Sequence, residues 1–436
     1  MSSKSRPHPS NGLLGVLLPP TGLARRIWLQ MFLLGTGVGT FLAGSAVYFT
    51  QVAGLSPAQV GAGLTAAGVA SAATSIPLGR LTDRVGSKRM WALSAGTAAG
   101  MYVLWPTVHS VLAFLAVIAA LKVAERAALG ARGAYILEAF RSDDAVTSMA
   151  FVRVAGNIGL LTGALVSGIA LAVDSIAAVR TIPLISAVTL AVNVLAVSKL
   201  PAAGSSRRQP GTGDTAPTAS RPGALRNRGF LTVSGLNGVL YTWDTLLNVV
   251  IPLWLVQETD APRVLLAGLF GTNAVICVLA QVGVASHVRS VRSALRASRI
   301  SGAFFVSTCL MVMVTHRTHG LVTILLVWVG HLLLTGAEMY QAAGQWGYVT
   351  HLSDPERRGE YQGVDQLGMT AGSVWAPAAY TFLTMHWGAL GWLLVAGVSV
   401  GASALLGSAV RGASAFVAGA GSAGRAGRTA TPGLGR

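Results

Sequence analysis

Long apolar runs recur along the whole sequence, and they constrain its fold more than any other feature. Each run is about long enough to cross the ~30 Å hydrocarbon core of a bilayer as a helix. The sequence therefore predicts an all-α membrane protein with twelve spans. The expected spans lie near residues 27–50, 57–79, 89–106, 109–135, 147–173, 177–198, 230–256, 263–285, 299–315, 320–345, 363–385 and 388–410.

The composition agrees with a chain that crosses a membrane many times. Of its 436 residues, 52% are hydrophobic and only 11% are charged, and the mean hydropathy is +0.60. These values are not those of a soluble enzyme. The net charge of +17 does not indicate a nucleic-acid partner, because the basic residues alternate with apolar spans instead of gathering on one face. Cys277 and Cys309 lie far apart in apolar segments, so neither a disulfide framework nor a metal site is expected.

The positions of lysine and arginine predict the orientation of the spans. Basic loops alternate with loops on the opposite side that carry only Arg180, Arg263 and Arg317. Because cytoplasmic loops retain positive charge, both termini are expected in the cytoplasm, which requires an even number of spans. No cleavable signal peptide is expected at the N-terminus. The excess of Arg over Lys, with abundant Ala and Gly, is typical of GC-rich bacteria, so we expect the inner (cytoplasmic) membrane of a bacterium.

A segment rich in Pro, Gly, Ser, Thr and Arg separates the first six spans from the last six, and it is expected to be a flexible cytoplasmic linker. The predicted order is a cytoplasmic tail (1–26), a six-helix domain (27–198), the linker (199–229), a second six-helix domain (230–410) and a cytoplasmic C-terminal tail (411–436).

The two halves also share a short sequence pattern. Glu125 and Tyr135 in the fourth span recur 213 positions later as Glu338 and Tyr348 in the tenth span. The same offset places the basic loop that follows the second span on residues 292–302. The pattern fits parallel repeats related by a pseudo-two-fold axis along the membrane normal.

The basic loop between the second and third spans contains the most specific motif of the chain, G-x-x-x-D-R-x-G-x-K-R. Its residues are Gly79, Asp83, Arg84, Gly86, Lys88 and Arg89. The glycines allow a tight turn and close helix approach, and the carboxylate can accept hydrogen bonds from a helix N-terminus or pair with an arginine. The motif resembles the loop signature of the major facilitator superfamily. We expect this loop to gate the conformational cycle without touching the solute.

The resemblance extends over about residues 25 to 410. Arg126, Gly130, Arg132 and Gly133 resemble the arginine-and-glycine signature of the family's fourth helix. Membership would imply two six-helix domains with a central cavity lined by helices one, four, seven and ten. In the proton-antiporter branches, the fifth helix bears a glycine-rich stretch interrupted by proline. No proline occurs here between Met149 and Ile182, which counts against drug–proton antiport and leaves the direction of transport open.

Charged side chains inside the spans are the candidates for binding solute or protons, because a charge in a bilayer is costly and faces a cavity or a partner. The candidates are Lys122, Glu125 and Arg126 in the fourth span, Asp244 in the seventh, and His331 and Glu338 in the tenth. Asp244 and Glu338 have no basic residue within a helical turn. The alternative for Glu125 is a structural pair with Lys122 or Arg126, and the alternative for His331 is a buried core residue.

No nucleotide-binding P-loop, H-E-x-x-H motif or G-x-S-x-G motif occurs, so we expect no enzyme activity, no cofactor and energy from a gradient. The predicted function is secondary active transport of a small organic solute by alternating access, coupled to protons, by a monomer in the lipid bilayer. Export is favoured because the candidate residues are mixed in charge and their surroundings are apolar. The alternatives are a nutrient importer or uniporter of the same fold, and a membrane sensor or scaffold that does not transport.

Overall fold

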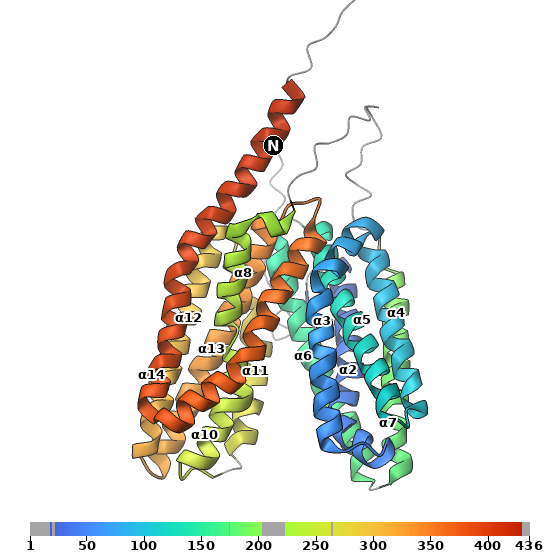
Figure 1. Ribbon diagram of the computed structural model, residues 1–436, viewed down its shortest axis with the longest axis vertical. Helices are drawn as coiled ribbons and strands as arrows, with labels where there is room; N and C mark the ends of the chain where they lie inside the picture. Colours follow the sequence, from blue (N-terminus) through green and yellow to red (C-terminus); the bar gives the residue numbers. More distant parts are fainter. Residues whose placement is uncertain are drawn as a thin grey trace, which may run out of the picture. The chain divides into compact units, whose positions relative to one another are not determined.

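The computed structural model describes residues 18–19, 22–140, 142–173, 175–202, 223–262 and 265–429, and every regular element in these ranges is a helix (Figure 1). The predicted all-α fold is therefore confirmed. The chain divides into two compact units, Met1–Ala203 with Ala274–Ser286, and Gly204–Asn273 with His287–Arg436. Most of the predicted N-terminal tail and linker lies outside the described residues.

The first unit contains six long helices. They are α2 (Gly22–Val47), α3 (Pro57–Val85), α4 (Ser87–Leu104), α5 (Val111–Ala139), α6 (Ser142–Ala172) and α7 (Ile176–Ser198). A π-helix, η1 (Tyr48–Val52), continues α2, and a 3₁₀ turn, η2 (Trp105–Thr107), ends α4. Buried aromatic side chains from these elements, including Phe41, Phe49, Trp105 and Phe114, form the centre of the hydrophobic core.

The second unit begins with a 3₁₀ turn, η3 (Ala224–Arg226), and a composite helix of α8 (Arg228–Leu240), α9 (Trp243–Thr245), the π-helix η4 (Leu246–Val250) and α10 (Ile251–Glu258). It continues with the first part of α11 (Leu265–Ser286), whose residues Ala274–Ser286 belong to the first unit. It then contains α12 (Val291–Val314), the 3₁₀ turn η5 (Thr315–Arg317), α13 (Leu321–Leu352) and α14 (Arg358–Thr429). At Gly388 the backbone of α14 is not helical (φ 49°, ψ −121°), so α14 consists of two helices. Counting the composite helix once and α14 twice gives the twelve predicted helices.

Nine helices in the described ranges are long and apolar enough to cross a bilayer by length and composition alone, with α14 counted once. The two remaining long helices, α4 and α5, are more polar. The first turn of α4 carries Lys88 and Arg89. The middle of α5 carries Lys122, Glu125 and Arg126 among its charged residues. The last residues of the motif lie on α4, and the fourth-helix residues lie on α5.

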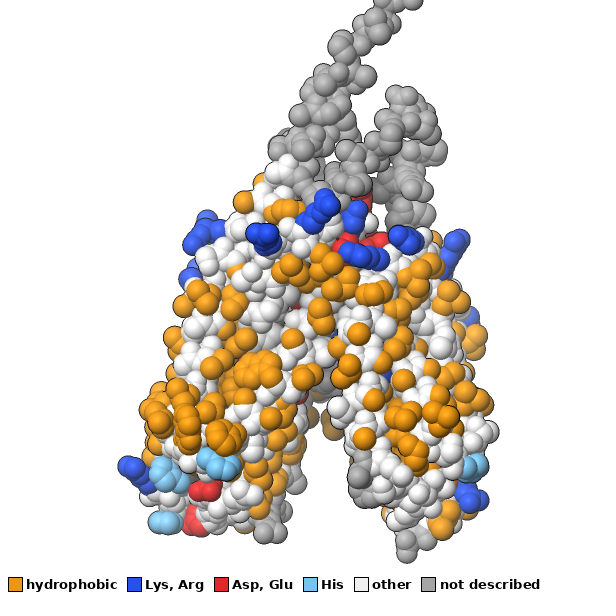
Figure 2. Space-filling view, viewed as in Figure 1, with side chains coloured by type: hydrophobic (Ala, Val, Ile, Leu, Met, Phe, Trp, Pro, Cys, Tyr) orange, Lys and Arg blue, Asp and Glu red, His pale blue; other side chains and the backbone are white. Residues whose placement is uncertain are grey.

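Apolar side chains cover the outer surface of the helices, as Figure 2 shows for one face. Leu112 is 78% exposed, Leu165 71% and Val374 70%, values that are unfavourable in water and suited to contact with lipid tails. On the face that Figure 2 shows, most lysine and arginine side chains lie at one end of the helices of each unit, and the histidines lie at the other end. This distribution is the one expected of a multi-pass membrane protein.

Glycines allow α2 and α6 to cross with their backbones in contact. A Cβ atom on Gly163 would lie 2.1 Å from the carbonyl oxygen of Thr36, and one on Gly159 would lie 2.2 Å from that of Phe32. The facing residue on α2, Gly39, would place a Cβ 2.3 Å from the carbonyl oxygen of Leu160. Small residues at this spacing let membrane helices pack closely. Packing therefore accounts for these glycines of the predicted fifth span.

The second unit repeats this crossing and other elements of the first. A Cβ on Gly368 of α14 would lie 2.4 Å from the carbonyl oxygen of Ser234 on α8, and one on Gly372 would lie 2.1 Å from that of Gly238. Each unit also has a π-helix late in its first helix, although η1 ends that helix whereas η4 is followed by α10. The 213-residue offset fails at the loop, however. Residues 292–302 lie inside α12, because α12 begins at Val291, eight residues before the predicted span.

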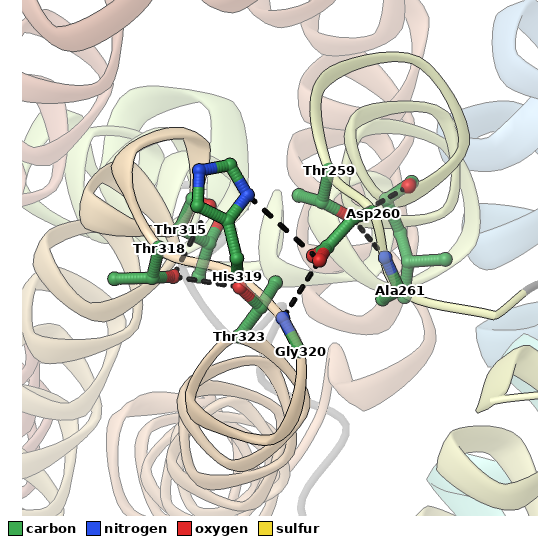
Figure 3. A network of polar contacts seen from close by, with 9 residues as sticks. Thr259, Asp260, Ala261, Thr315, Thr318, His319, Gly320 and Thr323 are labelled. Atoms are coloured by element: carbon green, nitrogen blue, oxygen red, sulfur yellow. Dashed lines mark hydrogen bonds and ion pairs between the residues drawn. The ribbon is translucent and has the colours of Figure 1, made fainter.

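At the end of the second unit where the histidines gather, a carboxylate joins two loops (Figure 3). Asp260, after α10, accepts a hydrogen bond of 2.7 Å from the backbone N–H of Gly320, at the start of α13. His319 Nδ1 lies 3.8 Å from the same carboxylate oxygen. Gly320 has φ +59°, a value that favours glycine. The Gly320 N–H, with a smaller contribution from His319, lowers the pKa of the Asp260 carboxyl below its ordinary value.

Candidate functional site

The motif loop is a one-residue turn between two helices. Gly79 is buried in α3, and Asp83 and Arg84 are exposed in its last turn. Gly86 connects α3 to α4 with φ +94°, a left-handed conformation that explains the second glycine of the motif. Asp83 takes part in a polar contact.

Residues at the start of α4 hold the ends of two other helices of the first unit. Ser87 Oγ donates a hydrogen bond of 2.6 Å to Glu138 at the end of α5. Lys88 Nζ donates to the backbone carbonyl of Leu200, two residues after α7. Arg89 of the motif is exposed. The Tyr135 hydroxyl of α5 donates to the backbone carbonyl of Pro201, the residue after Leu200, over 2.9 Å. Lys88 of the motif and Tyr135 of α5 therefore hold the segment that directly follows α7.

The charged residues of α5 have partners within the first unit. Lys122 Nζ and Glu125 Oε2 form an ion pair of 2.8 Å. Arg126 Nε donates to Ser71 Oγ of α3 over 3.0 Å. The ion pair is the contact expected of the structural alternative for Glu125, and it does not exclude a role in binding.

Close packing does not explain Gly130, the first glycine of the fourth-helix motif. Gly130 is buried, yet a Cβ there would meet no atom within 4 Å. Arg132 and Gly133 are half-buried. The described contacts do not bring these three residues together with Arg126.

Asp244 lies in α9, directly before the π-helix η4. Asn248 Nδ2 donates to its carboxylate over 2.9 Å and to its backbone carbonyl over 3.0 Å. The neighbouring Trp243 is buried, packs edge-on against Tyr241 and donates to Gln341 of α13 over 3.3 Å. Trp243 is thus a packing residue, and Asp244 has an amide partner on its own helix.

Glu338 and His331 lie on α13, near its middle. Glu338 is 4% exposed and His331 1%. Asn273 of α11 donates to Glu338 Oε2 over 2.8 Å and to Thr335 Oγ1 over 3.1 Å. Among the described residues, neither ring nitrogen of His331 has a hydrogen-bond partner. The backbone of Leu269 lies near the ring, outside good hydrogen-bonding geometry. The structure therefore places both predicted residues of the tenth span in a buried cluster that includes amide and hydroxyl groups.

A second buried polar cluster lies in the same unit, and the sequence analysis missed it. It consists of Asn237, Trp243, Gln341, Gln345 and Asp365, each at most 6% exposed. Asn237, Gln341 and Gln345 could not be found among the charged side chains of the predicted spans, because amide side chains carry no charge. Asp365 was obscured by its position at the start of the predicted span 363–385. Because α14 begins at Arg358, Asp365 lies two turns inside the helix.

Comparisons with known proteins agree with this architecture. The sequence matches the family profile described as Major Facilitator Superfamily over residues 27–377. No curated protein matches the sequence.

Three similar solved structures are all transporters or their homologues. A bacterial homologue of the iron transporter ferroportin, in an outward-facing state, has a TM-score of 0.69 at 14% identity, over 91% of this chain and 100% of that one. The fucose:proton symporter FucP of E. coli has a TM-score of 0.67 at 14% identity, over 89% and 98%. The proton:xylose symporter XylE has a TM-score of 0.64 at 12% identity, over 89% and 95%. At such low identity the likeness concerns the fold, whereas the profile match covers most of the chain: the protein belongs to the major facilitator superfamily.

Proposed function

We propose that this protein is a proton-coupled secondary active transporter that exports a small organic solute from a bacterial cell by alternating access. Transport and membership of the superfamily rest on the family match. Proton coupling, direction, the kind of solute and the location of both termini in the cytoplasm are the proposed refinements.

The observation that carries proton coupling is the burial of Glu338 near the middle of a 32-residue membrane helix. An ionisable group at such a depth is costly, and in membrane proteins such groups mark ion pathways and proton relays. Its described partner, Asn273, is a neutral amide that can donate to a carboxylate and accept from a protonated carboxyl. Glu338 can therefore keep a hydrogen bond in both protonation states, as a residue that exchanges protons must.

His331 and Asp244 are the further candidates in the second unit. His331 lies two turns before Glu338 on the same face of α13, since the two are seven residues apart. Asp244 accepts from a neutral amide, Asn248, just as Glu338 accepts from Asn273. In the first unit, Lys122, Glu125 and Arg126 supply charges of both signs. This mixed set in apolar surroundings supports an organic solute and export.

The proposal is tested with purified protein in liposomes that contain a pH-sensitive dye. A proton gradient is imposed, and candidate organic solutes are screened for movement against their own gradient. We expect Glu338→Gln and Asp244→Asn to abolish accumulation against a gradient while some downhill exchange remains, because solute still binds and only the proton step is lost. Opposite gradient directions in the same liposomes distinguish export from import.

The matched control is Glu258→Gln, at the exposed end of α10, which should accumulate solute as the parent does. If both Glu338→Gln and Asp244→Asn accumulate solute as well as the parent, neither carboxylate couples protons. Glu125 is then the remaining candidate. A parent protein that moves no solute in a broad screen but binds a partner protein would favour the sensor or scaffold.

A further inference from the structure

A continuous chain of buried hydrogen bonds runs through the second unit. Trp243 Nε1 donates to Gln341 Oε1 over 3.3 Å. Gln341 Nε2 donates to Gln345 Oε1 over 3.4 Å and to Asn237 Oδ1 over 3.3 Å. Gln345 Nε2 donates to Asp365 Oδ2 over 2.7 Å. The chain thus connects α8, α9, α13 and α14, and it ends on a carboxylate.

The chemistry of its first member fixes the direction of this chain. An indole N–H only donates, so the oxygen of Gln341 must face Trp243 and its NH₂ group must face away. The NH₂ group of Gln341 then requires the oxygen of Gln345, which leaves the NH₂ group of Gln345 for Asp365. Consecutive donations of this kind polarise and strengthen one another. The chain of hydrogen bonds therefore makes the NH₂ group of Gln345 a stronger donor to Asp365 Oδ2. A strong donor of this kind stabilises an ionised carboxylate.

The described residues supply no charged partner that would hold Asp365 permanently ionised. It is 5% exposed, and Gln345 is its hydrogen-bond partner among the described residues. The titratable groups on the helices packed against this part of α14 are Arg228 of α8, Asp244 of α9, and His331, Glu338, Tyr340, Tyr348 and His351 of α13. The described hydrogen bonds and ion pairs join none of them to Asp365. The amide of Gln345 can donate to the ionised carboxylate and accept from the protonated carboxyl, so it can stabilise Asp365 in either protonation state.

The helix crossing beside the chain contains buried polar atoms with unused hydrogen-bonding capacity. The amide nitrogen of Asn237 and the hydroxyl of Ser234, one turn apart on α8, have no partner among the described residues. The backbones of α8 and α14 touch here, because Gly368 packs on Ser234, and Asp365 lies one turn before Gly368. Buried polar groups of this kind are commonly satisfied by ordered water. Water at this crossing would give a proton a path to Asp365.

We propose that Asp365 is a proton-exchanging carboxylate, and that the amide chain from Trp243 through Gln341 and Gln345 sets its hydrogen bonding in both protonation states. The proposal rests on the proposed function only for the use made of the proton during transport. Asp365 would then be a proton site additional to Glu338, on the helix of the predicted span 363–385, where the sequence indicated no candidate residue.

Infrared spectroscopy of the full-length protein in lipid tests the proposal with protons as the only ligand. The C=O stretch of a protonated carboxyl is followed as the pH is changed. We expect a band that appears and disappears reversibly with pH, moves on labelling with ¹³C-aspartate, and is lost in Asp365→Asn. This substitution keeps an acceptor oxygen for Gln345, so the fold should persist. The isotope label assigns the band to aspartate even if the variant does not fold.

The role of the chain is tested by Gln345→Leu, which removes the donor to Asp365. A carbonyl that loses a hydrogen bond absorbs at higher frequency, so the Asp365 band should move up, and Gln341→Leu should move it less. The matched control is Gln30→Leu, which removes a buried glutamine bonded to Asn193 over 2.7 Å in the first unit and should leave the band in place.

Two results would overturn the proposal: an aspartate band that does not respond to pH, or one that survives Asp365→Asn. A band that Gln345→Leu leaves unmoved would overturn the role of the chain. These outcomes are separable from a failure of the proposed function. If no solute moves with protons while the Asp365 band titrates, the proposed function fails and the inference stands.

Discussion

At the scale of single residues, the hydrogen-bond donor next to a carboxylate influences how that carboxylate responds to pH. Asp260, which lies outside the membrane spans, is the example. Asp260 is held by the backbone N–H of Gly320, and this contact lowers the pKa of Asp260. A carboxyl whose pKa is lower in the folded protein contributes stability above its unfolded pKa and loses it as the pH falls through the folded value. The contact between these two loops is therefore expected to hold at neutral pH and to loosen in acid.

We predict that Asp260→Asn weakens this contact at neutral pH and removes its acid dependence. In the parent, hydrogen-exchange protection of the Gly320 amide should fall as the pH drops below about 4, the ordinary range of aspartate. In the variant, protection at pH 7 should be lower by roughly two- to fivefold, as for exposed ionic contacts, and should not change further in acid. Mass spectrometry of peptides that contain Gly320 measures both effects.

The neighbouring exposed carboxylate supplies the control for this prediction. Glu258→Gln, at the end of α10, should leave the protection of Gly320 and its acid dependence unchanged. An Asp260→Asn protein that keeps the parent's protection at every pH would show that the carboxylate does not hold the loop.

At the scale of elements, backbone contact at glycines decides which helices pair. In the first unit, α2 crosses α6 at Gly39, Gly159 and Gly163, and in the second, α8 crosses α14 at Gly238 and Gly368. Lipid tails are as apolar as the helices, so close packing and not the hydrophobic effect must hold such pairs together. These crossings are therefore the positions where one added methyl group should be felt most.

We predict that Gly163→Ala destabilises the protein by about 1–3 kcal/mol, because its Cβ would overlap a backbone that cannot move aside. The matched control is Gly168→Ala on the same helix, where a Cβ meets no atom within 4 Å. That substitution should be neutral or stabilising by about 0.5–1 kcal/mol, since alanine favours a helix over glycine. Thermal unfolding in detergent compares the two, and equal melting temperatures would argue against a backbone-contact crossing.

At the scale of the whole molecule, both units contain the same kinds of elements in the same order. Each has a π-helix late in its first helix, a glycine crossing, a third helix that ends in a 3₁₀ turn and a fourth helix with a Glu and a Tyr at equal spacing. The motif loop occurs only in the first unit, where Lys88 holds the Leu200 carbonyl beyond α7. This loop can therefore act on the chain that leads from the first unit to the second.

We predict that Asp83→Asn slows transport by roughly tenfold or more, the effect of losing a hydrogen bond to a charged group worth about 1.5–3 kcal/mol. Solute affinity in detergent should stay within a few-fold of the parent, because the loop lies at the end of α3 and α4 and is proposed to gate the cycle. Asp144→Asn, an exposed carboxylate in the first turn of α6, is the control and should transport normally. A large loss of affinity in a folded Asp83→Asn protein would contradict the gating role.

The features that could be predicted, the spans and the turns between them, depend on residues that are close together in the sequence. The expected spans 363–385 and 388–410 correspond to the two parts of α14, because Gly388 breaks the helix where the apolar runs meet. The expected span 299–315 began eight residues too late, because the arginines in the first turns of α12 lowered its hydropathy without ending the helix. The π-helices gave no signal, since a change of hydrogen-bond register leaves the residue types unchanged.

The class of fold, the twelve helices and the motif loop follow from the sequence alone, because the length of an apolar run, the positions of charge and a glycine turn are properties of neighbouring residues. Which polar groups meet depends on the tertiary structure. Asn273 reaches Glu338 across 65 positions, and Trp243 reaches Gln341 across 98. Asp365 became a candidate only when Gln345 was found beside it inside the bundle. Such contacts depend on how helices cross, and the crossing is set by backbone contact at glycines whose partners lie far away in the chain.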